Sequence, residues 1–432
     1  MTNKRSGDIF TFGFGATVLM WIVLYITAMP LGIVPLPLAA ILVGLLLLVV
    51  GYLRGRATGC SWAGGATLGL LIGFINLLIL SSMLGGNDPG EFLVSGLWWI
   101  GGFLVTAVVL CAIGAGLSKQ NEKYLTCPPN WTFRLALVTA STTLLMLISG
   151  GIVTGLEAGL AIEGWLTSDG YLMVLFPLEL MTRDVGSFAE HSHRLWGLLV
   201  GLTTIVLAVK VFVDGRSKGV KTLVVIAVIA VIIQGAMGGF RVTDQSIVLG
   251  IAHGVFGQMF FALLVVIAAV LSNAWDNSKP IVKANVKTDY TLSVILIAFL
   301  LLQITLGTVF RHIHPLEDLS RGARMGLLHG HSFIGSTAAA VLILWCSLRA
   351  WGMYKEQPLV HRVGKSMMHT LGLQIVLGFA SFIIVPHDVR GSDESITTHE
   401  VVITTAHQAT GALLLGICVL YAVLLRRLVK TT

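Results

Sequence analysis

The strongest restriction on the fold is a series of long apolar segments, each about as long as a membrane is thick. A helix needs about 20 apolar residues to cross the hydrocarbon core of a bilayer, and twelve such segments follow one another along the chain. With 55% hydrophobic and 11% charged residues, the 432-residue chain is too apolar for a soluble domain. We therefore expect an all-α polytopic membrane protein with spans at about 9–29, 35–53, 63–83, 93–117, 134–154, 190–213, 220–240, 247–272, 289–310, 325–348, 366–385 and 401–425.

The loops between these segments predict the orientation of the chain. Lysine and arginine are enriched in cytoplasmic loops, and here they occur in alternate loops, beginning with Arg54 and Arg56 between the second and third segments. Both termini are therefore expected on the cytoplasmic side. The same loops account for the net charge of +7, so we expect contact with membrane lipid and no nucleic-acid partner.

The last eight spans contain an internal repeat. A Gln-x-x-x-Gly sequence precedes both His253 and His407, beginning at Gln234 and Gln374. Because each half has four spans, the two halves cross the membrane in the same direction, and we expect an eight-helix core of two four-helix bundles. The predicted domains are an N-terminal four-helix extension without histidine or assigned function (1–125), a first repeat (126–280) and a second repeat (281–432).

Four histidines in apolar segments are followed by glycine at the fourth position. On a helix that glycine lies on the same face as the histidine, and its bare backbone leaves room for a flat group held by the imidazole. A porphyrin is such a group. A fifth pair, His387 with Gly391, falls in a polar loop, so the spacing also arises by chance. The four pairs are His193 with Gly197, His253 with Gly257, His331 with Gly335 and His407 with Gly411.

These four histidines are expected at a similar depth, because each lies near the outer end of its span. A single histidine in a span more often bonds a neighbouring helix, but four at matched positions favour axial ligands of haem iron presented by facing helices. Pairing within each repeat gives His193 with His253, and His331 with His407. His329 remains an alternative to His331 if that helix is rotated, and His312 is expected in an exposed outer loop.

Three arginines at the outer ends of spans are candidate partners for porphyrin propionates. They are Arg194, Arg241 and Arg311. A guanidinium group pairs with a carboxylate through two parallel hydrogen bonds. The alternative, strongest for Arg311, is that the side chain extends to lipid headgroups.

Glu190 distinguishes the two halves, because the aligned residue of the second half is Leu328. It lies one helical turn from His193 and shares its face. A carboxylate there can act as acid, base or anionic stabiliser, which suggests that only the first half carries out chemistry. The alternative is that Glu190 orients a ligand or pairs with Arg194.

Several stretches of residues 134–426 resemble the haem A synthases of aerobic respiratory assembly. The Glu-x-x-His-Arg motif of EHSHR is the most specific of them. The resemblance implies an enzyme that oxidises a methyl group of haem O to the formyl group of haem A for cytochrome oxidase. The other stretches are GGIVTGLEAGLAIEGW, QGAMGGFRVTDQS, AHGVFGQMFFAL, LLQITLGTVFRH, HGHSFIGS and AHQATGALLLG.

By that resemblance the first half would hold haem O, the substrate, between His193 and His253, with Glu190 beside it. The second half would hold a resident haem b, with its iron between His331 and His407. We expect the inner (cytoplasmic) membrane of a bacterium, with the haem sites near the outer face, where the predicted topology places the four histidines. Haem O synthase and cytochrome oxidase assembly factors would be its partners.

The chain departs from that family in two places. The outer loop of residues 155–189 lacks the cysteine pair of some bacterial members, and Ser332 follows His331 where the family often has arginine. Two other functions fit the same histidines: a dihaem b-type electron carrier, and a haem-handling transporter or chaperone. A carrier usually places its haems at different depths, whereas all four ligands are expected near one face.

Overall fold

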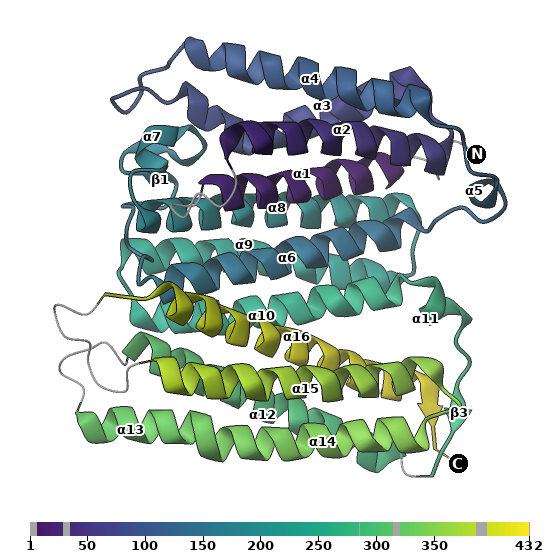
Figure 1. Ribbon diagram of the computed structural model, residues 1–432. Coiled ribbons are helices and arrows are strands. Elements are labelled where there is room, and N and C mark those ends of the chain that lie inside the picture. Colours follow the sequence, from purple (N-terminus) through teal and green to yellow (C-terminus); the bar gives the residue numbers. More distant parts are fainter. Residues whose placement is uncertain (1–6, 29–34, 285, 314–319, 386–394, 432) are drawn as a thin grey trace. The chain divides into compact units, whose positions relative to one another are not determined.

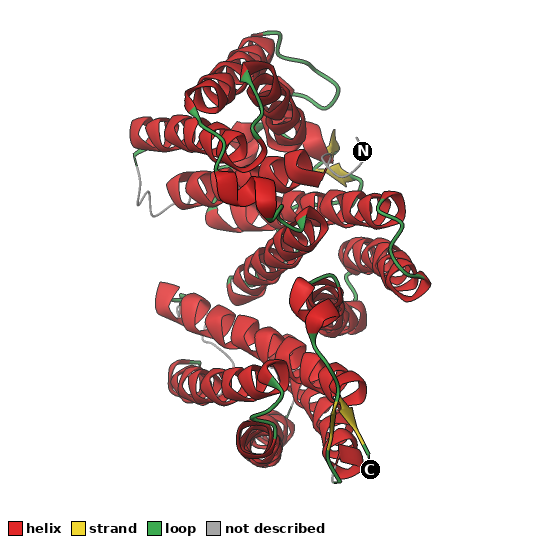
Figure 2. Cartoon of the chain, turned by 90° about the vertical axis from the view of Figure 1, so that its right-hand side faces the viewer, coloured by secondary structure: helices red, strands yellow, loops and turns green. Residues whose placement is uncertain are grey.

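The computed structural model describes residues 7–28, 35–284, 286–313, 320–385 and 395–431, so His387 and Gly391 lie outside the described residues. Helices make up most of this structure (Figures 1 and 2). Twelve of its helical segments are long and apolar enough to cross a membrane, which confirms the predicted fold class.

The spans follow the predicted order. They are α1 (Gly7–Ala28), α2 (Leu36–Thr58), α3 (Trp62–Leu80), α4 (Ser95–Leu117), α6 (Trp131–Gly155), α8 (Val185–Val213), α9 (Lys218–Thr243), α10 (Ile247–Val270), α12 (Val286–Ile313), α13 (Arg321–His329) continued by the π-helical turn η4 (Gly330–Gly335) and α14 (Ser336–Met353), α15 (Pro358–Ile384) and α16 (Thr398–Leu428). The shorter elements are η2 (Ser81–Leu84), α5 (Glu122–Thr126), β1 (Thr167–Ser168), β2 (Tyr171–Leu172), η3 (Met173–Leu175), α7 (Leu178–Met181), α11 (Asn273–Asn277), β3 (Ile281–Val282) and β4 (Val429–Lys430).

Several helices begin before the apolar segment that predicted them. Helix α8 begins at Val185 because the Asp184 side chain accepts a hydrogen bond from the Ser187 backbone N–H and caps the helix. Helix α15 begins at Pro358, where proline is tolerated in the first turn. Hydropathy locates the part of a helix that can lie in lipid, whereas capping residues locate its end.

The chain forms two compact units, residues 1–142 with 158–228, and residues 143–157 with 229–432. Helices α6 and α9 each contribute residues to both units. The predicted domain boundaries, 1–125, 126–280 and 281–432, stay predictions.

In the first unit, helices α1 to α4 pack on one another, and α1 and α3 also pack on α8. Two aromatic contacts join α1 to α8. The ring centres of Trp21 and Trp196 are 5.2 Å apart, and those of Tyr25 and Phe188 are 5.1 Å apart. The N-terminal helices therefore support the helix that carries the Glu-x-x-His-Arg motif (Figure 1).

Buried polar contacts tie the N-terminal helices together. The Trp21 indole N–H donates to Asn76 Oδ1 over 3.0 Å, and Asn76 Nδ2 donates to Thr17 Oγ1 over 3.2 Å. Arg54 Nε lies 2.8 Å from Asp8 Oδ2, and both side chains are buried. Unpaired polar groups are costly in lipid, so these contacts fix which faces of α1, α2 and α3 meet.

In the second unit, α12, α14, α15 and α16 form a closed four-helix bundle. Each helix packs on the next, α16 packs on α12, and α10 packs against α12 and α16. Leu296, Met367 and Cys418 are fully buried in its apolar core.

One end of this bundle is closed by a buried polar cluster. The Asp289 carboxylate, 1% exposed, accepts hydrogen bonds from Arg349 Nε and from the Tyr354 hydroxyl. Burial and the bond to Asp289 raise the pKa of Tyr354, which keeps its hydroxyl protonated as a donor. The cluster joins α12 to the C-terminal end of α14.

Removing the Asp289 carboxylate should destabilise the second unit. In Asp289→Ala, Arg349 and Tyr354 lose their shared partner, and breaking a buried ion pair costs about 3 kcal/mol. We expect a clearly lower midpoint of thermal unfolding in detergent, measured by tryptophan fluorescence. Glu356→Ala removes only a surface contact with Lys283 and should shift stability by about 0.5 kcal/mol or less. Equal midpoints for the two variants would contradict this account.

Candidate functional site

Gln234 on α9 and His253 on α10 hold each other through two hydrogen bonds. Gln234 Nε2 donates to the His253 carbonyl over 2.9 Å, and His253 Nδ1 lies 3.1 Å from the Gln234 carbonyl oxygen. A carbonyl oxygen can only accept, so Nδ1 carries the proton in this contact. In a neutral imidazole, the unprotonated lone pair is then on Nε2, the nitrogen that can bind a metal.

Glycines on both helices allow this close approach. A Cβ atom on Gly238 would lie 2.8 Å from His253 Cε1, and one on Gly257 would lie 2.9 Å from Gln234 Nε2. Each glycine therefore makes room for the long side chain of the opposite helix. The Gln-x-x-x-Gly and His-x-x-x-Gly sequences form one interlocked helix contact.

The same contact joins α12 to the π turn η4. Gln303 Nε2 donates to the His331 carbonyl over 2.6 Å, and His331 Nδ1 lies 3.1 Å from the Gln303 carbonyl oxygen. A Cβ atom on Gly307 would lie 2.7 Å from His331 Cε1. Gln303 and Gly307 form a third Gln-x-x-x-Gly sequence, which was not predicted alongside those at Gln234 and Gln374.

Helices α15 and α16 make a variant of the contact. A Cβ atom on Gly378 would lie 2.9 Å from His407 Cε1, and one on Gly411 would lie 3.4 Å from Gln374 Nε2. Here, however, Gln374 Nε2 lies 3.3 Å from His407 Nε2. His407 Nδ1 has no hydrogen-bond partner within the described residues.

The interlocked contacts bring the rings of His331 and His407 close together, in a perpendicular arrangement. Their ring centres are 6.3 Å apart and the ring planes make an angle of 88°. A metal–imidazole bond is about 2.0 Å long and the ring centre lies about 1.1 Å behind the nitrogen, so two imidazoles bound to opposite sides of one metal have centres about 6 Å apart. His329 instead packs its ring against Phe333, at 5.5 Å.

Both histidines line a cavity of about 550 Å³ within the second unit. Its walls are mostly apolar, with a few polar groups from facing helices, as in sites that bind cofactors. His331 lines it and His329 does not, as far as the described residues go. Further lining residues include Phe310, Arg311, His312, Phe333, Phe382 and Gly411.

Arg311 lies at this cavity and also caps α6. Its Nη2 donates to the carbonyls of Thr154 and Gly155 over 3.0 and 3.1 Å, and lies 3.8 Å from the Glu157 carboxylate. The expected exposure of His312 in an outer loop is wrong. The residue is half-buried in the last turn of α12, because α12 continues to Ile313.

Arg241 and His312 meet over Gly250. A Cβ atom there would lie 3.1 Å from Arg241 Nε and 3.1 Å from the His312 ring. Three basic side chains, those of Arg241, Arg311 and His312, therefore gather near one end of the second unit. Of these, the cavity lining within the described residues includes Arg311 and His312.

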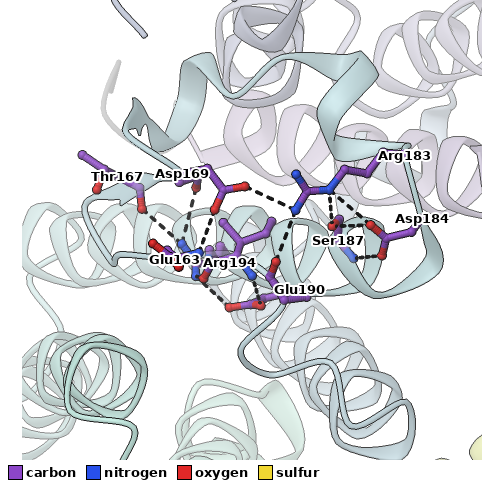
Figure 3. A network of polar contacts seen from close by, with 11 residues as sticks. Glu163, Thr167, Asp169, Arg183, Asp184, Ser187, Glu190 and Arg194 are labelled. Atoms are coloured by element: carbon purple, nitrogen blue, oxygen red, sulfur yellow. Dashed lines mark hydrogen bonds and ion pairs between the residues drawn. The ribbon is translucent and has the colours of Figure 1, made fainter. Parts of the chain in front are cut away.

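In the first unit, both oxygens of Glu190 are hydrogen-bonded. Glu190 Oε1 accepts from Arg194 Nη2 over 2.7 Å, and Oε2 accepts from the Ile162 N–H over 2.9 Å. Arg194 also donates to the carbonyls of Ile162 and Thr167, at 2.9 and 3.2 Å. The pair thus holds the loop before α8 against that helix, as Figure 3 shows.

A second set of contacts in Figure 3 fixes the other end of that loop. Arg183 bridges Asp169, at 3.3 Å, and the Ala161 carbonyl, also at 3.3 Å. The backbone N–H of Ser187 donates to Asp184 and lowers the pKa of that carboxyl. The loop preceding the motif is therefore ordered by charge and by helix capping.

The two histidines of the motif have different surroundings. His191 is fully buried, its ring centre lies 4.8 Å from that of Phe176, and neither of its ring nitrogens has a hydrogen-bond partner within the described residues. His193 and Gly197 are half-buried. His193 belongs to the first compact unit and His253 to the second, so their pairing stays a prediction.

All four proposed ligands occupy similar places along their spans. Each lies between six and ten residues after the first residue of its span. His312 and Gln303 line the cavity with His331. Neither residue was predicted as part of a site from the sequence. The spacing of Gln303 and Gly307 was the signal that could have identified the glutamine.

Residues 134–326 match the family model described as cytochrome oxidase assembly protein. The match includes the Glu-x-x-His-Arg motif and His253 and ends before His331. A comparison with curated proteins gave no match. The resemblance drawn from the motifs is confirmed over these residues, which are similar to the cytochrome oxidase assembly protein family.

Proposed function

We propose that the protein is a haem A synthase-like enzyme that oxidises a methyl group of haem O to a formyl group. The family model that residues 134–326 match is described as a cytochrome oxidase assembly protein, which supports a role in that assembly. The observation that carries the finer proposal is the pair of imidazoles, 6.3 Å apart, at a cavity of about 550 Å³. A group of helices that only transported small apolar molecules would not need this donor pair.

The second unit is proposed to hold a resident haem b between His331 and His407. Three features fit that group: the ring separation, the Nε2 lone pair that the Gln303 carbonyl leaves on His331, and the apolar cavity wall. Arg311 and His312 would pair with its propionates. When bound, haem iron accepts and passes on single electrons.

The first half is proposed to hold haem O through His193 and His253. His253 has the same Nδ1–H contact as His331, which supports its use as a ligand through Nε2. Arg194 and Arg241 are proposed propionate partners, and Gly197 and Gly257 are proposed to lie against the porphyrin, with Gly335 and Gly411 in the same role in the second half. Haem O synthase and oxidase assembly factors are the proposed partners.

Glu190 is proposed to act next to the reacting methyl group. It is 3% exposed, and its negative charge is held in place by Arg194 and the Ile162 N–H. A fixed carboxylate in a dry site stabilises positive charge that develops during oxidation and accepts protons released from the substrate. The same contacts also hold the loop before α8 in place, so an experiment has to separate this structural role of Glu190 from a catalytic one.

Loss of either proposed haem b ligand should remove the bound haem b. In His331→Ala and His407→Ala we expect the purified protein to lose its low-spin b-type absorption spectrum, because one axial bond is missing. His329→Ala is the matched control, since its ring packs on Phe333, and should keep the spectrum. An unchanged spectrum in both ligand variants would reject the resident-haem proposal.

The perpendicular rings predict a particular magnetic signature. When axial imidazole planes are crossed, two iron d orbitals become nearly equal in energy, and the oxidised low-spin haem gives a strongly anisotropic EPR signal. The 88° angle between His331 and His407 therefore predicts that signal for haem b. An ordinary rhombic signal would show that the rings are parallel in the loaded protein.

Haem extraction tests the reaction and the role of Glu190 together. Cells that make haem O and wild-type protein should yield haem A, whereas Glu190→Gln should lower the yield about a hundredfold or more. The amide still accepts the Ile162 N–H, so the loop contact is kept while the charge is lost. Glu163→Gln, an exposed change in the same loop, should have no effect.

The outcomes of that experiment separate three conclusions. Wild-type cells without haem A would reject the enzyme proposal and favour a dihaem electron carrier or a haem-handling transporter. Undiminished haem A in Glu190→Gln would reject only the catalytic role of Glu190. Unfolded Glu190→Gln protein would mean that its charge is structural, and Arg194→Lys would then test the ion pair separately.

A further inference from the structure

The π turn η4 coincides with one of the proposed ligands. It spans Gly330–Gly335 and contains His331, inside an otherwise regular span. A π turn holds one extra residue, is uncommon, and often marks a functional position. In this helix the turn is explained by the hydrogen bonds that the His331 carbonyl accepts.

The carbonyl of His331 has three donors instead of one. It accepts from the Ser336 N–H, from Ser336 Oγ at 2.7 Å and from Gln303 Nε2 at 2.6 Å. Gln303 Nε2 also lies 2.8 Å from Ser336 Oγ. In an α-helix this carbonyl would accept from the Gly335 N–H. The amide of Gln303 lies against Gly335 instead, and a side chain inserted there opens the helix.

We propose that Gln303, with Gly307 and Ser336, is a positioning residue that sets the direction and the tautomer of His331. This inference rests on the proposed role of His331 as a haem ligand. Gln303 fixes the backbone of His331 through its amide and receives the His331 Nδ1–H at its own carbonyl. Gly307 opens the path to that carbonyl, since a Cβ atom there would lie 2.7 Å from His331 Cε1.

The extra residue of the turn lets one helix bury apolar residues in the bundle core and also direct His331 to the cavity. After the turn, Ala339, Ile343 and Cys346 are buried in the core of the bundle. Within the turn, His331 lies near His407 and both line the cavity. A regular helix has a fixed angle per residue, so the extra residue changes the direction of His331 relative to the buried face of α14.

Helix α10 provides a natural comparison. Gln234 and His253 make the same two bonds, yet α10 is a continuous helix. The residue five positions after His253 is Gln258, whereas the residue five positions after His331 is Ser336. The Ser336 hydroxyl is therefore the donor that η4 has and α10 lacks. The glutamine–glycine pair, which orients the histidine, is common to both.

Gly307→Ala and Gln303→Leu test the proposal without removing a ligand. Alanine favours a helix more than glycine does. Leucine already precedes a glycine by four positions in α6, at Leu147 and Gly151, the spacing of Gln303 and Gly307. Both substitutions therefore suit a membrane span. We expect the haem b of either variant to transfer to apomyoglobin about tenfold faster or more than in wild type, as for losses of residues that orient metal ligands. The EPR anisotropy should fall as the His331 ring turns.

Gly372→Ala is the matched control, because no atom lies within 4 Å of a Cβ atom at that glycine, and it should behave like wild type. Wild-type haem transfer and an unchanged EPR signal in folded Gly307→Ala and Gln303→Leu would overturn the positioning role. Faster transfer in Gly372→Ala as well would also overturn it, because the effect would not depend on contact with the histidine.

A measurement without haem separates this inference from the proposed function. The side-chain ¹⁵N shifts of His331 in labelled, haem-free protein report which ring nitrogen carries the proton. We expect the Nδ1–H form in wild type and a mixture of tautomers in Gly307→Ala. If wild type binds no haem b yet shows this change, the positioning role stands and the haem proposal fails. The same tautomer in all variants would reject the positioning role.

Discussion

The candidate site in the second unit depends on an imidazole N–H that reaches a backbone carbonyl of the neighbouring helix across a glycine. That carbonyl already belongs to its own helix ladder, so only a residue without a side chain opens a path to it. The returning bond from the glutamine amide satisfies the histidine carbonyl in a medium that offers no water. His253 and His331 share this arrangement, which makes it a property of the repeat.

The glycines of these helices consequently have a structural role that differs from the one predicted by their spacing. The His-x-x-x-Gly pattern predicted glycines beside a porphyrin, and that role stays a prediction. In the structure, Gly257, Gly335 and Gly411 lie against the glutamines of the neighbouring helices, and Gly411 also lines the cavity. The glycines that touch the imidazoles are Gly238, Gly307 and Gly378, each on the preceding span.

The sequence was sufficient for the fold class because spans and loops are set by local composition. Hydropathy predicts a span from its own residues, and all twelve are found. The π turn was not predictable in this way, since the His331 carbonyl accepts from Gln303, which lies far away in the sequence, as well as from Ser336. The half-buried position of His312 and the bond of Glu190 to the Ile162 N–H were missed for a similar reason, whereas the pair of Glu190 with Arg194, one helical turn away, was among the alternatives. Each depends on a neighbour that only the fold supplies.

The buried pair of Asp8 and Arg54 constrains how the N-terminal helices enter the membrane. Asp8 is in the first turn of α1 and Arg54 near the end of α2, and Arg54 also donates to the Gly64 carbonyl of α3. A single charge placed in lipid costs several kcal/mol, and pairing removes most of that cost only when both helices are present. The pair therefore favours insertion of α1 and α2 together over insertion of either helix alone.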